Sequence, residues 1–164
     1  MRIFGIDPGL ARMGYGVIDF DGNSLRLVTY GCIETPAHSP MPTRLIQIDT
    51  QLNQLLKETA PDEASFEELF FYQNKTTGIS VAQARGVEVT AVERLAIPLY
   101  EYTPGQIKQA ITGYGRATKI QMQNAVKMLL RMQEVPKPDD AADGLAAAIT
   151  HAFGQRFKEQ QRMR

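Results

Sequence analysis

Two hydrophobic runs rich in β-branched residues, residues 3–6 and 14–18, open the chain, and an aspartate follows each of them. A Pro8-Gly9 turn and a short linker join the two runs, which is a pattern typical of a β-hairpin. Side chains alternate along a strand, and apolar residues on both faces of the first run predict a central strand. Asp7 then ends a buried element, where an isolated carboxylate is costly. It therefore needs a partner, which is a cationic side chain or a bound metal.

The next patterns predict one more strand of the hairpin sheet, a helix and a strand beside the first. Residues 24–34 alternate well enough to be a third antiparallel strand, in which Gly31 favours a bulge. Helical spacing of apolar residues follows from Thr43 until Pro61 ends it. Residues 63–71 include Glu and Ala, which favour a helix, but their place between two helical segments predicts a fourth strand parallel to the first.

A second helical segment over residues 79–96 contains Gly86, and a fifth short strand over 98–102 follows it. Glycine in mid-helix costs about 1 kcal/mol relative to alanine. Gly86 therefore indicates close approach to another element, either the sheet or a helix of a second copy of the chain. Capping boxes that begin at Thr103 and Thr118 then predict the starts of two further helices.

Apolar stripes define the face that the last helices bury. After Thr118 the stripe consists of Ile120, Ala125, Met128, Leu129 and Met132. A final helix begins at Asp139, with its core face formed by Ala142, Leu145, Ala146, Ile149 and Phe153. The order of elements predicts an α/β fold, with a mixed five-stranded sheet, three strands antiparallel and two parallel, and helices on both faces. We expect one domain over residues 1–158 and a polar tail over residues 159–164.

The composition shows that charge is distributed unevenly between the two parts of the chain. Basic and acidic residues both number 18, but residues 1–102 carry 8 basic and 13 acidic side chains and residues 103–164 carry 10 and 5. A basic half is typical of a nucleic-acid-binding face, although ordinary variation in surface charge explains it equally well.

The one cysteine, Cys32, excludes a disulfide framework within the chain. Without a signal peptide or an apolar run of about 18 residues, we expect a cytoplasmic protein that spans no membrane.

Four carboxylates fall where this fold brings elements together. Asp7 ends the central strand, and the neighbouring parallel strand carries Glu67 and Glu68, of which alternation alone selects neither. Asp140 and Asp143 are three residues apart and so share one helix face; the helix dipole accounts for one such acid but not for a pair. Four acids can stay ionised together only around cations, and all-oxygen ligands favour two Mg²⁺ or Mn²⁺ ions. Such a pair of ions suits the hydrolysis of a phosphodiester.

Several motifs occur in order over nearly the whole chain. They are GIDPG, MGYGVID, FEELFF, QARG, the two capped helix starts, and DAADGLAAAITHA. GIDPG alone is found in other ribonuclease H-like proteins and in sugar-kinase-type ATPases, but the full set resembles the RuvC family of Holliday junction resolvases. The resemblance implies a ribonuclease H-like fold, a homodimer, and Mg²⁺- or Mn²⁺-dependent paired nicking of four-way junctions near the crossover, in DNA recombination and repair.

The resemblance also implies roles for particular residues. Carried over position by position, the catalytic and metal-binding acids are Asp7, Glu67, Asp140 and Asp143. Phe70 matches an aromatic residue used at the junction centre, with packing in the core as its alternative role. Lys108 and Lys119 match DNA-contacting positions, and Arg116, in the turn between them, is expected to bind DNA too. Gly144 departs from the family pattern, because a larger helix former is expected there. The RuvA-RuvB branch-migration complex is implied as a partner.

Other functions stay open at this point. An ATP-binding protein of the actin and sugar-kinase type would need two such domains and a second phosphate loop, and a chain of 164 residues without a repeat has neither. Another ribonuclease H-like nuclease, acting on different branched DNA or on RNA, would carry the same sheet and acids. A non-catalytic junction-binding protein would lack at least one of the four acids.

Overall fold

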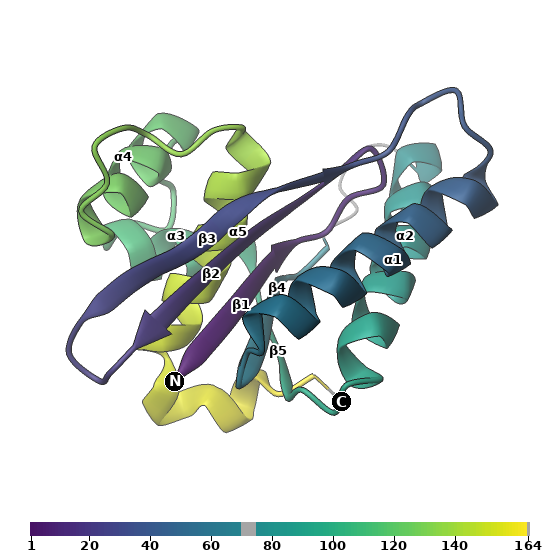
Figure 1. Cartoon of the computed structure of the whole chain (residues 1–164). Helices are drawn as coiled ribbons and strands as arrows, with labels where there is room; N and C mark the ends of the chain where they lie inside the picture. Colours follow the sequence, from purple (N-terminus) through teal and green to yellow (C-terminus); the bar gives the residue numbers. More distant parts are fainter. Residues whose placement is uncertain (70–74, 164) are drawn as a thin grey trace.

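The computed structural model describes residues 1–69 and 75–163. Within them the chain forms a five-stranded sheet between two layers of helices (Figure 1). The strands are β1 (Arg2–Asp7), β2 (Arg12–Phe20), β3 (Leu25–Glu34), β4 (Glu63–Glu67) and β5 (Leu99–Tyr102). The helices are α1 (Met41–Thr59), α2 (Lys75–Glu93), α3 (Pro104–Thr112), α4 (Lys119–Leu129), α5 (Asp139–Phe153) and the short 3₁₀ helix η1 (Gln155–Gln161).

The strand order is β3-β2-β1-β4-β5. β1, β2 and β3 form the antiparallel meander, whereas β4 pairs parallel with β1 and β5 pairs parallel with β4. This arrangement confirms the predicted fold class. β4 ends at Glu67, earlier than the predicted end of the fourth strand at residue 71. β1 therefore lies at the centre of the sheet, with parallel and antiparallel neighbours on its two sides.

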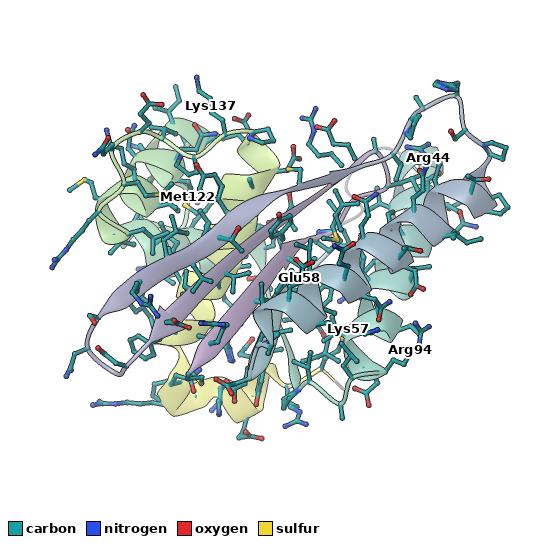
Figure 2. All side chains as sticks on the ribbon, in the orientation of Figure 1. Arg44, Lys57, Glu58, Arg94, Met122 and Lys137 are labelled. Carbon is teal, nitrogen blue, oxygen red and sulfur yellow. The ribbon has the colours of Figure 1, made fainter. Side chains whose placement is uncertain are left out.

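The two faces of the sheet bury different helices. Phe4 and Ile6 of β1 pack with α1 and α2, and Ile3 packs with α3, α4 and α5. In Figure 2, Lys57 of α1 and Arg94, just after α2, lie on the opposite side of the molecule from Met122 of α4. Because side chains alternate along a strand, Asp7 lies on the same face as Ile3 and points toward the α5 layer.

Both predicted capping boxes are present at the helix starts. The Gln106 backbone N–H donates to the Thr103 hydroxyl at 3.1 Å, and the Thr103 backbone N–H donates to the Gln106 side-chain oxygen at 2.8 Å. Thr118 and Gln121 repeat this pair of hydrogen bonds at the start of α4. Each box satisfies N–H groups that a helix start leaves without intrahelical partners, so these two starts are defined locally.

Helix α5 lies against the backbone of the hairpin, because glycines line the contact from both sides. A Cβ atom built on Gly5 would lie 2.1 Å from the Gly144 carbonyl oxygen, and one on Gly14 would lie 1.8 Å from the Asp140 carbonyl oxygen. A Cβ on Gly144 would lie 2.6 Å from the Tyr15 Cα. Gly144 thus weakens the helix locally but lets α5 approach β2 more closely than any side chain would permit.

Three expectations about individual positions are wrong. The irregularity between β2 and β3 lies at Val17 and Ile18, not at Gly31, which pairs with Tyr15 and leaves room for the Tyr15 ring. Phe153, predicted to face the core, is 47% exposed at the end of α5. On α4, Ile120 and Met128 of the predicted stripe are exposed, and the buried residues are Met122 and Val126. The other members of the predicted stripe, Ala125, Leu129 and Met132, are partly buried against the core, so the prediction is wrong only at Ile120 and Met128.

The end of the chain lies against β5. The Met163 backbone N–H donates to the Leu99 carbonyl at 2.9 Å, and Arg162 pairs with Tyr100 in an isolated bridge. The predicted polar tail, residues 159–164, is therefore attached to the sheet edge through its described residues. None of the helices in the described ranges combines the length and the apolar character needed to cross a membrane.

Candidate active site

Asp7 and Glu67 end two adjacent parallel strands at the same level. Ile6 pairs with Phe66 in the register of β1 and β4, so the residues that follow them lie side by side. Phe66 packs on the α1 and α2 side of the sheet. Alternation therefore turns Glu67 toward α5, the same side as Asp7. Glu68, which the sequence pattern left as an alternative, follows the end of β4.

Helix α5 brings the other two predicted acids across these strand ends. Gly14, the partner of Asp7 in the hairpin, abuts the backbone of Asp140. Asp140 lies in the first turn of α5, and Asp143 follows on the same face. Asp140 and Asp143 therefore approach Asp7 because glycines replace side chains at this contact.

Burial and mutual repulsion perturb the ionisation of these carboxyl groups. Burial raises the pKa of Asp7 to about 9, with further contributions from the negative charges of Glu67, Asp143 and Asp140. Burial also raises the pKa of Glu67 to about 7, and the charge of Asp143 adds to this shift while Lys108 and Lys119 oppose it. The pKa of Asp143 is raised mainly by burial, against the opposing effect of Lys119. When all of these carboxyl groups are ionised, their negative charge exceeds the positive charge of the side chains around them.

Two of the predicted basic residues border the acids. A cavity of about 230 Å³ lies between β4, α3, α4 and α5, and its lining includes Glu67, Asp143, Lys108 and Lys119. The Lys119 ammonium lies 3.6 Å from an Asp143 carboxylate oxygen. Arg116 is exposed in the turn between α3 and α4, outside this lining. Phe70 lies outside the described residues, so its assignment stays a prediction.

The donor set fits hard divalent cations. In residues 1–69 and 75–163, no three Asp, Glu, His or Cys side chains already form a compact metal-binding group. Two of the acids instead pair with cationic side chains, Asp140 with Arg12 at 3.2 Å and Asp143 with Lys119. Four carboxylates within electrostatic reach of one another nevertheless supply only oxygen ligands, which suit Mg²⁺ or Mn²⁺ rather than softer metals.

Sequence reasoning missed two residues beside the acids. Arg12 bridges Asp140 and Glu34 from the start of β2, at 3.2 and 3.0 Å. Glu88 is fully buried in α2, and its negative charge contributes to the raised pKa of Asp7. No sequence pattern identifies Arg12, whose partners are distant in the chain. Glu88 had a signal, since it interrupts the apolar face of a helix.

The mixed sheet, the acids at the ends of two parallel strands and the crossing helix define a class, the ribonuclease H-like nucleases. Comparison with known proteins gives the family within that class. The model of the family Crossover junction endodeoxyribonuclease RuvC matches residues 3–151. The chain belongs to the RuvC family, and it is an endonuclease that resolves Holliday junctions by hydrolysing DNA phosphodiester bonds.

Individual relatives agree with this assignment over almost the full length. Crossover junction endodeoxyribonuclease RuvC of Brevibacillus brevis is 57% identical over 157 residues, which cover 96% of this chain and 95% of that protein. The protein of the same name from Finegoldia magna is 50% identical over 100% of both chains. The structure of Thermus thermophilus RuvC in complex with a Holliday junction substrate superposes with a TM-score of 0.87 at 32% identity, covering 95% and 96% of the two chains. The resemblance inferred from the motifs is thereby confirmed.

Proposed function

We propose that Asp7, Glu67, Asp140 and Asp143 are the catalytic acids and bind the metal ions that cleave the junction. The observation that carries this proposal is their convergence: two adjacent strand ends and one helix start direct four carboxylates toward the same region. The raised pKa values of Asp7 and Glu67 support it, because perturbed titration in a shared site is typical of catalytic groups.

The chain's own residues set up the reaction in three ways. The four carboxylates provide ligands for Mg²⁺ or Mn²⁺, and their charge suits two ions for each active site. When bound, such ions supply a water of lowered pKa and neutralise charge at the phosphate. Lys119 and Lys108, at the rim of the cavity, attract the DNA backbone toward the acids. Arg12 and Lys119 pair with Asp140 and Asp143 and reduce their repulsion before the ions bind.

The four-way junction is proposed to lie over the basic segment that contains α3 and α4. Residues 103–137 contain six basic side chains and one acidic side chain, Glu134, so a locally positive surface offsets the neutral total charge. Lys108, Arg116 and Lys119 are proposed DNA contacts on this segment. Phe70 follows Glu67 by three residues and is proposed to act at the junction centre.

Paired nicking of two strands requires two active sites, and we propose a homodimer that supplies them. The outer surface of α1 and α2 supports this proposal, because a groove of about 410 Å³ runs between these helices and includes Gly86. A Cβ atom on Gly86 would meet nothing within 4 Å in the described structure, so Gly86 is not needed for packing on the sheet. The RuvA-RuvB complex as a partner and a cytoplasmic location remain predictions.

A nicking assay tests the acid site. We expect symmetrical nicks in a synthetic mobile four-way junction with Mg²⁺ or Mn²⁺, none with EDTA, and none in a linear duplex of equal length. Asp7→Asn should bind the junction with nearly unchanged affinity but nick it at least about 10³-fold more slowly. Asp139→Asn is the matched control, since Asp139 precedes Asp140 on the exposed side of α5 and should keep most of the activity.

Three results would contradict these assignments. Retained cleavage by Asp7→Asn would remove Asp7 from the site. Equal losses from Asp7→Asn and Asp139→Asn would indicate a general effect of charge. Cleavage that persists in EDTA would contradict the metal requirement.

A further inference from the structure

Glu88 is a carboxyl group in a position that helical spacing reserves for apolar residues. It lies in α2 on the face that contacts the sheet, and its neighbours on that face are Ala84, Ala91 and Val92, all fully buried. Glu88 is itself 0% exposed. Burial of a carboxyl group in such surroundings is costly unless a hydrogen bond or a charge compensates it. Packing alone would favour alanine or leucine here, so this acid needs a specific explanation.

The partner of Glu88 lies in the turn between β1 and β2. The Gly9 backbone N–H donates to Glu88 Oε1 at 3.3 Å, a contact between residues 79 positions apart. Within the described residues, Glu88 Oε2 is buried without a hydrogen-bond partner. One oxygen of the carboxyl group therefore binds a backbone donor that follows Asp7 by two residues.

The turn that contains Gly9 is held from a second direction as well. A Cβ on Gly9 would lie 2.0 Å from the Arg12 carbonyl oxygen, so the turn is tightly closed. On the side of β3, the Thr35 hydroxyl donates to the Leu10 carbonyl at 2.5 Å and the Thr35 backbone N–H donates to the Ala11 carbonyl at 3.1 Å. Glu88 supplies the corresponding contact from α2.

Both ends of this turn belong to the acid site. Asp7 precedes it, and Arg12, which follows it, lies 3.2 Å from the Asp140 carboxylate. A shift of the turn would therefore move Asp7 and Arg12 together, relative to Glu67 on β4 and Asp140 on α5. Groups behind a metal ligand often set its orientation and, through it, the metal affinity.

We propose that Glu88 is a positioning residue for the nuclease site: its buried carboxyl group fixes the turn after Asp7 through the Gly9 N–H and so holds Asp7 in place for the metal ions. This inference rests on the proposed role of Asp7. Glu88 acts through the backbone and needs no contact with DNA or metal.

The test compares two substitutions of Glu88 with one control on the same helix. Glu88→Leu removes the acceptor and keeps the side chain large and apolar, whereas Glu88→Gln keeps a carbonyl oxygen for the Gly9 N–H. The control, Glu93→Leu, replaces a glutamate by leucine at an exposed position of α2. The measurements are the NMR resonance of the Gly9 amide and the affinity for Mn²⁺ by calorimetry, both without DNA.

We expect Glu88→Leu to move the Gly9 resonance and to weaken Mn²⁺ binding about tenfold. Glu88→Gln should keep both the Gly9 resonance and the Mn²⁺ affinity close to those of the wild type, and Glu93→Leu should change neither. The proposal is overturned if Glu88→Leu leaves the Gly9 resonance or the Mn²⁺ affinity unchanged, or if Glu88→Gln changes them as much as Glu88→Leu does. If Glu88→Leu does not fold, hydrogen exchange decides: a Gly9 amide protected in the wild type and in Glu88→Gln supports the proposal, and an unprotected one overturns it.

Asp7→Asn separates this proposal from the assignment of the acids. If Asp7→Asn binds Mn²⁺ as tightly as the wild type does, the assignment of Asp7 fails. If Asp7→Asn loses Mn²⁺ binding while Glu88→Leu retains it, only the proposal for Glu88 fails.

Discussion

Asp7 links the ionisation of the acid site to the stability of the protein. Its pKa is raised to about 9 by burial and by the charges around it, Glu67 first among them. The folded protein without metal therefore binds the Asp7 proton more tightly than the unfolded chain does. Stability must then decrease as pH rises from the ordinary carboxyl value near 4 toward about 9. Bound cations compete with these protons and reverse the effect.

A comparison of Asp7→Asn with the wild type measures this linkage. In EDTA we expect the variant to be the more stable protein at pH 8, because folding of the wild type takes up a proton at Asp7, which costs free energy at this pH, whereas asparagine binds no proton in either state. The difference in free energy of unfolding should shrink steadily as pH falls toward 5, because the proton that the wild type takes up on folding costs less as pH approaches the carboxyl pKa of the unfolded chain. Urea unfolding across this pH range provides the values. A difference independent of pH would show that Asp7 titrates normally in the folded protein.

The contact between α5 and the hairpin determines the site at the level of elements. Gly5 and Gly14 from the sheet and Gly144 from the helix bring two backbones together. Such a contact cannot adjust by rotation of a side chain, because the atoms that meet belong to the main chain. The distance between the acids on α5 and those on the strands depends on this spacing.

Gly144→Ala should lower the free energy of unfolding by about 1–3 kcal/mol, although alanine is the better helix former. The added methyl would lie 2.6 Å from the Tyr15 Cα and force α5 away from β2. We also expect slower nicking, because Asp140 and Asp143 would move with the helix.

Gly105→Ala in α3 is the matched control for this substitution. The added methyl there would meet its nearest atom at 3.8 Å, so its effect on stability should be neutral or favourable. Urea unfolding of both variants decides between these expectations. Equal effects would mean that the contact between α5 and β2 is not tight.

Local patterns in the sequence predicted the helices and strands better than they predicted the contacts between these elements. The hairpin, the capping boxes at Thr103 and Thr118 and the acids of α5 follow from neighbouring residues, and so they could be identified. Alternation left Glu67 and Glu68 undecided, because the face of a strand depends on its neighbours. Gly144 looked like a weak helix position, since the backbone that it meets lies about 130 residues earlier in the chain. Arg12 went unnoticed for the same reason, since its partner Asp140 lies far along the chain, whereas Glu88 could have been found as a charged residue on the apolar face of α2.

At the scale of the whole molecule, the two helical layers have different proposed tasks. Helices α3, α4 and α5 cover one face of the sheet, and α1 and α2 cover the other (Figure 1). The acids and the basic cavity belong to the first layer, and the groove of the proposed dimer lies between α1 and α2. Ile46 of α1, which lines this groove, is 66% exposed in the single chain. The sheet thus separates the proposed association surface from the layer that holds the proposed active site.

Ile46→Glu should therefore shift the protein from dimer to monomer. A buried charge in the interface lacks a partner, and we expect the dissociation constant of the dimer to rise at least about tenfold. Ile120→Glu is the matched control, because Ile120 is 71% exposed on α4, in the other layer. Sedimentation velocity of the two variants and the wild type gives the oligomeric state. Identical behaviour of the two variants would place the dimer surface elsewhere.

Helix α5 follows all five strands of the sheet in the sequence, and this order has a consequence during protein synthesis. A ribosome releases Asp7 and Glu67 long before it releases Asp140 and Asp143, because chains grow from the amino terminus. The proposed acid site can be completed only when α5 has emerged and docked on the hairpin. A nascent or truncated chain that lacks α5 can retain α1 and α2 but holds only half of the acids. If the four acids cut DNA as proposed, the order of translation keeps an unfinished chain inactive.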